Sequence, residues 1–486
     1  MLAKEEIARM VEAVMQKMAR DGVIAPALEQ GARAAQRAAS EGAVPIDPTG
    51  VYPTVTEAAR AARVAFAQLQ ALPLLKRREI VGAMRVAARA HERPLAEHAV
   101  RETGLGRVDD KVLKNRFAAE KTPGVEDILT LSWSGDDGLT VVERAPWGVI
   151  GSITPTTNPT STIINNAISL VSAGNAAVFN FHPMAKGCCA ATVELLNRAI
   201  EGAGGPASLL TCVAEPTIET AQALMQHPGI DALLVTGGGP VVTLAMTCGK
   251  KVWAAGPGNP PTVVDETADL AKAAKAIVDG ASFDNTVLCT AEKECFVVAP
   301  VADQLKQLMV EHGAYEVRWS EIDRLVRLLY PSGDTTGKGL DRRYIGKDAA
   351  LILKAAGLTP APNTRLVICE VPPDHPFVTN EMLLPVLPVV RVPDVDTAID
   401  RAIRAEKGHR HTASIHSNDI RNLSRMAREA GCAIFVKNGP HYAGLGIGGE
   451  GFTSLSIAGT TGDGITSART FTRERRCVMV GHLRII

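Results

Sequence analysis

Apolar and charged positions follow a helical spacing at the start of the chain. Between residues 2 and 20, charged side chains occupy one face, and apolar side chains recur every three or four positions at Leu2, Ile7, Met10, Val11, Val14, Met15 and Met18. This spacing predicts a short amphipathic helix that ends near Asp21 and Gly22. The stretch from Val23 to Gly50 is rich in Ala, Gly and Pro and predicts a tether. A helix this short is marginal in water, so its apolar face needs a partner or the chain's own folded part.

Further along, the hydrophobic pattern predicts a mixture of helices and strands. Residues 54–121 have helical spacing, and residues 139–144 alternate as an exposed strand does. From residue 149 onward the two kinds of element alternate, with strands at 149–153, 176–179 and 232–235 and helices at 161–171, 187–200 and 240–247. Such alternation predicts a parallel sheet covered by helices, which binds ligands at the carboxyl ends of its strands. A second α/β unit begins after residue 261.

Length and composition narrow the class of protein. A chain of 486 residues is long enough for two or three domains. Its formal net charge is zero, so it has no basic field that could hold nucleic acid or anionic lipid. No apolar run of about 18 residues predicts a membrane span, and acidic residues interrupt the start where a signal peptide would be apolar. We therefore expect a globular protein without a nucleic-acid or membrane partner.

The cysteines give the first candidate chemistry. There are nine, an odd number without a Cys-x-x-Cys pair, which favours reduced thiols in the cytosol over a disulfide framework or a metal site. Cys289 follows a polar turn and precedes a β-rich run at 295–298. A thiolate there could attack a carbonyl carbon and carry an acyl group as a thioester. The alternative is a buried structural cysteine, the interpretation we favour for Cys295 because it lies inside the predicted strand.

The segment around Cys289 resembles the nucleophile region of the aldehyde dehydrogenase superfamily, in which Phe and Asn precede a Cys that Thr-Ala follows. Further segments similar to that superfamily occur in its order, from about Val51 to the C-terminus: Trp147-Gly148-Val149-Ile150-Gly151, Thr154-Pro155-Thr156-Thr157-Asn158-Pro159, Ala173-Gly174-Asn175, Val235-Thr236-Gly237-Gly238-Gly239 and Asn380-Glu381-Met382-Leu383-Leu384-Pro385-Val386. Each segment alone is weak evidence, and their shared order is strong.

This resemblance implies an aldehyde dehydrogenase-like α/β fold with a Rossmann-type cofactor domain, an α/β catalytic domain and a small β oligomerisation arm. The expected parts are the helix at 1–22, the tether at 23–50, a dinucleotide- and CoA-binding domain at 51–130 and 147–260, a catalytic domain at 261–455, and the arm at 131–146 and 456–486. In the superfamily such an arm joins subunits, which implies a homodimer or homotetramer.

The resemblance also implies roles for single residues. Asn158 matches the asparagine that donates its amide to the aldehyde oxygen, although alone it could be an ordinary turn residue. Glu381 matches the glutamate that accepts hydrogen bonds from the nicotinamide ribose. The segment Asn180-Phe181-His182-Pro183 stands where hydrolytic members have Lys-Pro-Ser-Glu, so the choice between NAD and NADP stays open. The expected cofactor-binding residues are Ile153, Thr154, Pro155, Thr156, Asn180, His182, Pro183, Gly237, Gly238, Gly256, Pro257, Glu381 and Leu383.

One segment departs from the hydrolytic pattern. Hydrolytic members carry Glu-Leu-Gly-Gly-Lys where this chain has Trp253-Ala254-Ala255-Gly256-Pro257-Gly258-Asn259. The glutamate of that segment is the general base that activates water, and Ala255 or Gly256 stands in its place here, so this chain has no carboxylate at that position. Coenzyme A thiolate could release the acyl group without activated water. The Gly-Pro-Gly-Asn-Pro-Pro run also resembles the CoA-acylating branch. His411 is a candidate proton shuttle for CoA, and a structural histidine is the alternative.

Together these features predict a CoA-acylating aldehyde dehydrogenase with NAD or NADP and coenzyme A and without a metal. We expect propanal as the substrate, with acetaldehyde second. The helix at 1–22 is similar to encapsulation peptides of bacterial microcompartment enzymes, which implies a shell-protein partner and a cytoplasmic location inside a microcompartment. The alternatives are a hydrolytic aldehyde dehydrogenase and a non-catalytic cargo or scaffold protein.

Overall fold

The strands predicted between residues 149 and 235 form the centre of a six-stranded parallel sheet with the order β1-β6-β5-β4-β7-β8. β4 and β5 are buried on both faces, which explains their continuous apolar runs. The sequence did not predict β6 and β8. The bounds are β1 (Val51–Tyr52), β4 (Val149–Ile153), β5 (Ala176–Asn180), β6 (Leu210–Val213), β7 (Ala232–Thr236) and β8 (Lys251–Ala255). We call this sheet and its helices the six-stranded unit.

The computed structural model describes Asp47 and residues 49–484, so the predicted helix at 1–22 and most of the tether lie outside the described residues. The end of the predicted tether belongs to the folded part. The backbone N–H of Gly50 donates to the carbonyl of Asp47, and the Asp47 carboxylate accepts from the N–H of Thr49 at 2.8 Å. Gly50 is buried beside β6.

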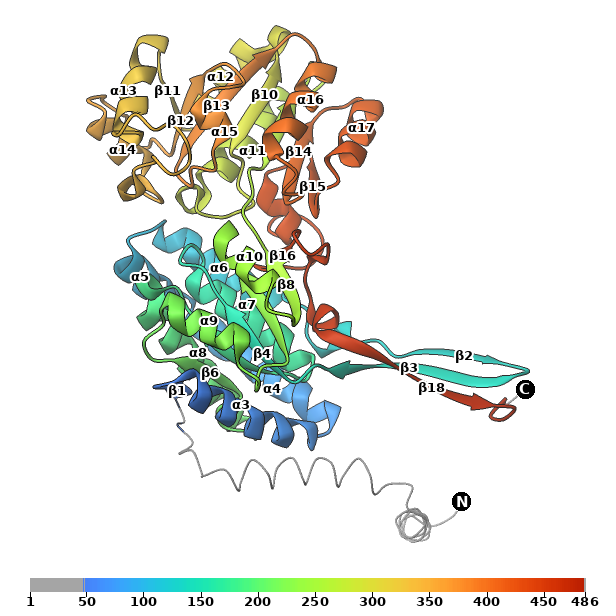
Figure 1. The fold of residues 1–486 in the computed structure, drawn as a ribbon. Coiled ribbons are helices and arrows are strands. Elements are labelled where there is room, and N and C mark those ends of the chain that lie inside the picture. The colour runs from blue at the N-terminus through green and yellow to red at the C-terminus, as the bar shows by residue number, and fades with distance from the viewer. Residues whose placement is uncertain (1–46, 48, 485–486) are drawn as a thin grey trace, which may run out of the picture.

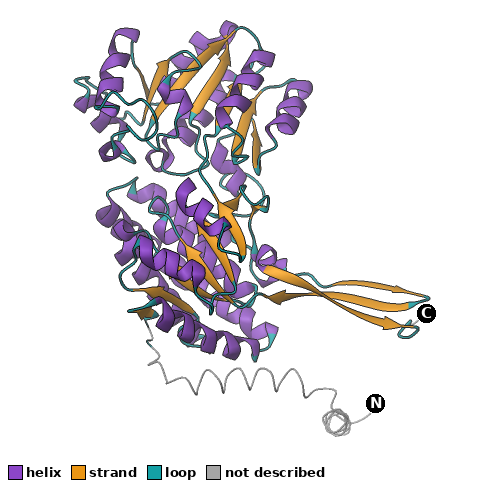
Figure 2. Cartoon of the chain, in the orientation of Figure 1, coloured by secondary structure: helices purple, strands orange, loops and turns teal. Residues whose placement is uncertain are grey.

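Helices pack around the six-stranded sheet, as Figure 2 shows. The first begins at a capping box, because the hydroxyl of Thr54 accepts from Glu57 N–H and the Glu57 carboxylate accepts from Thr54 N–H. These helices are α3 (Val55–Gln70), α4 (Leu74–Ala90), α5 (Glu92–Thr103), α6 (Val108–Lys121), α7 (Pro159–Ser172), α8 (Lys186–Gly202), α9 (Ile218–Gln226) and α10 (Gly239–Met246), with the short turns η1 (Val125–Asp127) and η2 (Pro183–Ala185).

The second half of the chain builds a seven-stranded parallel sheet with the order β11-β12-β13-β10-β9-β14-β15, the upper part of Figure 1. Its strands are β9 (Pro261–Val264), β10 (Glu294–Val298), β11 (Ala314–Glu316), β12 (Leu366–Glu370), β13 (Val386–Val392), β14 (Thr412–His416) and β15 (Ile434–Lys437). Its helical elements are α11 (Leu270–Ser282), η3 (Phe283–Thr286), α12 (Ala299–Glu311), α13 (Trp319–Leu329), η4 (Arg342–Tyr344), α14 (Ala349–Ala355), α15 (Pro376–Thr379), α16 (Val395–Glu406), α17 (Ile420–Ala430) and η5 (His441–Leu445). We call it the seven-stranded unit.

A three-stranded antiparallel arm projects from the six-stranded unit (Figure 1). It pairs β2 (Leu131–Gly135) and β18 (Thr472–Val480) with the two edges of β3 (Gly138–Pro146), so segments more than 300 residues apart lie side by side. Residues 468–471 form the turn η6 (Ala468–Phe471), and the C-terminal strand begins at Thr472. A small ribbon of β16 (Ile457–Ala458) and β17 (Gly464–Ile465) lies beside β8.

The segment from Gly256 to Pro260 joins the two sheets, since it leaves β8 and enters β9. Asn259 anchors it. Its side-chain amide donates to the Glu294 carboxylate and to the carbonyls of Val378 and Ala405, each at 3.0 Å. The polar residue within the Gly-Pro-Gly-Asn-Pro-Pro run therefore ties the connection to the seven-stranded unit.

Candidate active site

Cys289 follows a turn with unusual backbone geometry. Asp284, Asn285 and Thr286 all have positive φ, at 49°, 54° and 66°. Each such residue costs of order 1 kcal/mol or more unless its surroundings hold it. Here the Asn285 amide donates to the carbonyl of Gly346 at 3.0 Å, and the Thr286 hydroxyl donates to the carbonyl of Ala281 at 2.5 Å. The polar residues before the cysteine are therefore the ones that fix its loop.

The half-buried thiol of Cys289 opens onto a cavity of about 140 Å³ between the two units. Burial raises the pKa of Cys289 to about 11, and the Glu381 carboxylate adds to this shift. The ammonium of Lys293 opposes this shift, and it donates to the carbonyls of Thr286 and Leu288 at 3.1 Å. In this state the thiol is protonated at neutral pH, so its reactivity depends on neighbouring charges.

Cys295, the rival candidate, does not face this cavity. It lies in β10 with no exposed surface and packs against the apolar core of the seven-stranded unit. Burial raises the pKa of its thiol far above the ordinary value. These surroundings fit a packing role.

Asn158 lines the same cavity as Cys289, from the start of α7. Its side chain is almost fully buried, and its carbonyl oxygen Oδ1 accepts from the ammonium of Lys114 at 2.6 Å. Its amide nitrogen Nδ2 donates to the Thr157 hydroxyl at 3.1 Å and carries a second hydrogen. An amide donor and a thiol thus meet at one cavity, the arrangement that stabilises an oxyanion during attack on a carbonyl.

Glu381, Leu383 and His411 reach this cavity from the seven-stranded unit. Burial raises the pKa of Glu381 to about 7, which Lys293 limits. Burial lowers the pKa of His411 to about 3, so its imidazole is neutral at pH 7, and its Nδ1 lies 2.9 Å from the Thr412 hydroxyl. Among the described residues that line the cavity, Glu381 is the sole carboxylate.

The connecting segment passes directly over the histidine. Gly256 and Pro257 line the cavity together with Ala255, so the position of the hydrolytic glutamate presents no acid. A Cβ added to Gly258 would lie 2.9 Å from Cγ of His411. The close approach requires glycine there, because any side chain would displace the imidazole.

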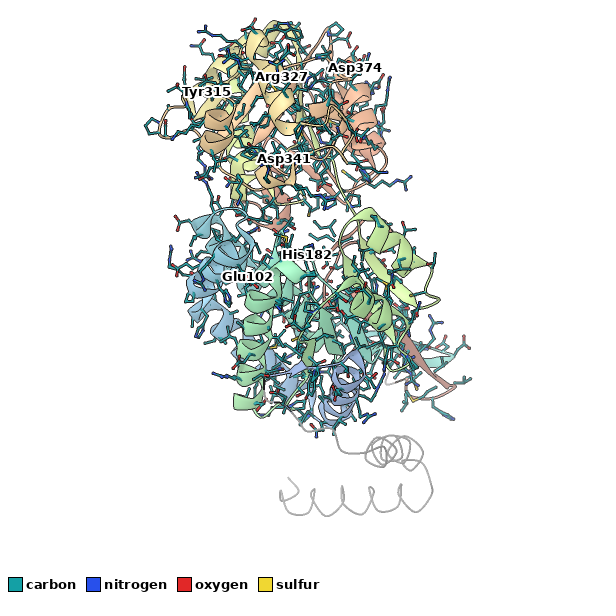
Figure 3. The ribbon with its side chains drawn as sticks, turned by 60° about the vertical axis from the view of Figure 1, so that its left-hand side comes forward. Glu102, His182, Tyr315, Arg327, Asp341 and Asp374 are labelled. Carbon is teal, nitrogen blue, oxygen red and sulfur yellow. The ribbon has the colours of Figure 1, made fainter. Side chains whose placement is uncertain are left out.

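A second cavity, of about 290 Å³, lies beside the first and shares Pro155, Thr157, Thr236, Gly237 and Gly238 with it. Figure 3 shows His182, one of its lining residues, at the end of the six-stranded unit nearest the other unit, below Asp341. This cavity brings together the remaining predicted cofactor residues, namely Ile153, Thr154, Thr156, Asn180, His182 and Pro183.

The second cavity fits a dinucleotide. The buried hydroxyls of Thr154 and Thr156 have no hydrogen-bond partner in the chain, which leaves them for a polar ligand. A Cβ at Gly238 or Gly239 would meet open space, so the backbone at the start of α10 is accessible to a phosphate group. Asn180 has fewer hydrogen-bonding sites left for a ligand, because its Oδ1 already accepts from the Thr220 hydroxyl at 2.7 Å.

The sequence did not predict a role for three charged residues near Asn158, namely Lys111, Lys114 and Asp284. Lys111 and Lys114 lie three positions apart on α6, a spacing that usually marks a solvated helix face, yet both are buried against Asp284. Lys293 is the fourth missed residue, four positions after Cys289. No group of described residues has the composition of a metal site, and no described helix is long and apolar enough to cross a membrane.

Comparison with known proteins agrees with this geometry. The aldehyde dehydrogenase family matches residues 48–318, more than half of the chain. The chain belongs to the aldehyde dehydrogenase family. It is 49% identical to the acetylating acetaldehyde dehydrogenase of Salmonella typhimurium, over 92% of this chain and 96% of that protein.

Two solved aldehyde dehydrogenase structures are similar throughout. The propionaldehyde dehydrogenase of Rhodopseudomonas palustris, with bound CoA and an acylated cysteine, is 44% identical with a TM-score of 0.88, over 90% of this chain and all of that one. The propionaldehyde dehydrogenase from the fucose utilisation bacterial microcompartment of Clostridium phytofermentans is 43% identical with a TM-score of 0.88, over the same shares. The predicted family and fold are therefore confirmed.

The assignment of the nucleophile predicts different effects for the two cysteines. Cys289→Ala should abolish aldehyde-dependent NADH formation, because no thiol remains at the cavity. Cys295→Ala should retain most of it, since that thiol lies in the core. Steady-state absorbance at 340 nm measures both, and sustained NADH formation by Cys289→Ala would contradict the assignment.

The assignment of the oxyanion donor predicts a large kinetic effect without unfolding. Asn158→Ala should lower kcat by roughly a hundredfold or more, as the loss of one oxyanion donor does elsewhere. Circular dichroism should show an intact fold. A kcat within about twofold of the unmodified enzyme would mean that Asn158 serves the turn alone.

Proposed function

We propose that this chain is a CoA-acylating aldehyde dehydrogenase, which converts a short aldehyde, coenzyme A and NAD⁺ to acyl-CoA and NADH. The observation that carries the proposal is the composition of one cavity. It holds a thiol and a buried amide donor, and it has Ala255 and Gly256 where a hydrolytic enzyme needs a general base.

The residues of the cavity support a ping-pong sequence. The sulfur of Cys289 bonds to the aldehyde carbon while Asn158 and the backbone N–H of Cys289 donate to the oxygen. The thiol proton ends on this oxygen as the hydroxyl of a thiohemiacetal. Nicotinamide, when bound, would supply the acceptor for the hydride of this carbon, and the hydroxyl proton would pass to water, so that a thioester to Cys289 remains. The CoA sulfur then bonds to the acyl carbon and the bond to Cys289 breaks, while the imidazole of His411 relays the proton of the CoA thiol to the departing sulfur of Cys289.

The similar proteins act on acetaldehyde or propanal, and the cavity at Cys289 is small. Both observations support a short aldehyde, with propanal the first choice and acetaldehyde the second. NAD is the proposed electron acceptor. NADP is the alternative, because Asn180 stands at the position of the lysine that grips the adenosine ribose in hydrolytic members.

The arm supports assembly into a homodimer or homotetramer. Trp133 and Val480 are 55% and 75% exposed on it, which is unfavourable unless a second copy covers them. A similar enzyme comes from a bacterial microcompartment. Together with the amphipathic pattern at 1–22, this supports a cytoplasmic enzyme packaged inside a microcompartment through a shell protein.

The missing base gives the decisive test. Without CoA the enzyme should form at most about one NADH per active site and then stall, because nothing at Ala255 or Gly256 activates water. Addition of CoA should restart turnover and yield acyl-CoA, which chromatography identifies. Sustained formation of free carboxylic acid without CoA would place the chain in the hydrolytic branch, with Glu381 as the candidate base.

The packaging proposal predicts that residues 1–22 are dispensable for catalysis. Their deletion should leave kcat and the unfolding temperature nearly unchanged and reduce self-association, because a partner-binding face makes its contacts elsewhere. The segment fused to a fluorescent protein should co-localise with shells in bacteria that make them. Diffuse fluorescence together with a less stable truncated enzyme would show that the helix belongs to the fold.

A further inference from the structure

A buried cluster of charges lies behind the amide of Asn158. Lys111 and Lys114 on α6 both donate to the Asp284 carboxylate, Lys111 at 2.9 Å and Lys114 at a still closer approach. The side chains of both lysines are 2% exposed, and that of Asp284 is fully buried. Two ammonium groups thus share one carboxylate in a region without access to bulk water.

The cluster carries an excess of positive charge. The nearby carboxylate of Asp110 offsets this charge only in part, because Asp110 also pairs with Arg365 at 3.1 Å and accepts from the backbone N–H of Asp284. A buried charge without its own counter-ion opposes folding, so a contribution to stability does not account for this cluster. Its position next to a catalytic amide suggests a contribution to the reaction.

The contact between Lys114 and Asn158 has a direction. The two ends of an asparagine side chain have nearly the same shape, so packing alone does not decide which end faces the cavity. An ammonium group can only donate, and Lys114 lies 2.6 Å from Oδ1 of Asn158. The lysine therefore selects the orientation in which the N–H donors of the amide remain for the substrate.

The positive charge of Lys114 also lies where it can stabilise negative charge in front of the Asn158 amide. Burial lowers its pKa to about 8, which Asp284 opposes, so the group is mainly charged at pH 7. A positive charge behind the amide strengthens the amide as a donor and favours negative charge in front of it. Such effects are large where water is excluded.

We propose that Lys114 is a positioning residue for the oxyanion: its ammonium fixes the Asn158 amide with the N–H toward the aldehyde oxygen and adds positive charge behind it. Lys111 donates instead to Asp284 and, at 3.2 Å, to the carbonyl of Thr157, and it makes no hydrogen bond to the Asn158 side chain. This inference rests on the proposed oxyanion role of Asn158.

A double-mutant cycle tests the proposal at pH 7, with the rate of the first NADH formed per site in the absence of CoA as the readout. Lys114→Met removes the charge and the donor, and should slow this step about tenfold or more. Lys114→Gln keeps an amide donor and should lose less. The double variant Lys114→Met with Asn158→Ala should be within about threefold of Asn158→Ala alone, because the lysine acts through the amide.

Two controls separate this role from a structural one. Lys111→Met also removes a partner of Asp284. Its effect on the rate of the first NADH and that of Asn158→Ala should be multiplicative in the double variant, because Lys111 does not act through the Asn158 amide. The alkylation rate of Cys289 by iodoacetamide should change less than about threefold in Lys114→Met, because Lys293 lowers the pKa of this thiol more than Lys114 does. If Lys114→Met fails to fold, the same cycle with Lys114→Gln replaces it.

The outcomes are distinguishable. Fully multiplicative effects of Lys114→Met and Asn158→Ala, an unimpaired Lys114→Met, or equal non-additivity for Lys111→Met would overturn the role of Lys114 and leave the proposed function intact. If Asn158→Ala itself is unimpaired, the oxyanion assignment and the inference fail together. Acyl-CoA formation by the unmodified enzyme tests the proposed function independently of both.

Discussion

The carboxylate of Asp284 holds the two halves of the active site in register. It accepts from the backbone N–H of Arg107 at 2.7 Å and from both lysines of α6, all in the six-stranded unit. Its own backbone belongs to the left-handed turn that leads to Cys289 in the seven-stranded unit. Through Lys114 the same carboxylate reaches Asn158. The distance between Cys289 and the amide of Asn158 therefore depends on one buried anion, whose desolvation the two ammonium groups offset.

The residues that the sequence could identify are those with a local pattern. β4, β5 and β7 were predicted because buried parallel strands are continuous apolar runs. Cys289, Asn158 and Glu381 were found through short segments that resemble a known family, and His411 was proposed as a proton shuttle for CoA. The structure brings all four to one cavity. Whether each performs its expected role stays a prediction.

The residues that the sequence could not identify depend on contacts distant along the chain. Lys114 and Asp284 are 170 residues apart, and neither position shows by itself that it is buried. Two lysines and two aspartates within seven positions of α6 suggest a solvated face, and tertiary packing overrides that pattern. The arm shows the same limit. An exposed strand was predicted at 139–144, but its pairing with Thr472–Val480 followed from family resemblance and not from any local signal.

The loss of the hydrolytic carboxylate and the presence of a neutral histidine are parts of one local design. The segment that connects the two sheets has no side chain at Gly258, so it approaches the His411 ring closely, while Asn259 fixes its far end with three hydrogen bonds. A glutamate at residue 256 would add a second carboxylate to a cavity where Glu381 already raises the pKa of Cys289. That added charge would further disfavour the thiolate. A neutral imidazole at His411, in contrast, adds no further anion beside the Cys289 thiol.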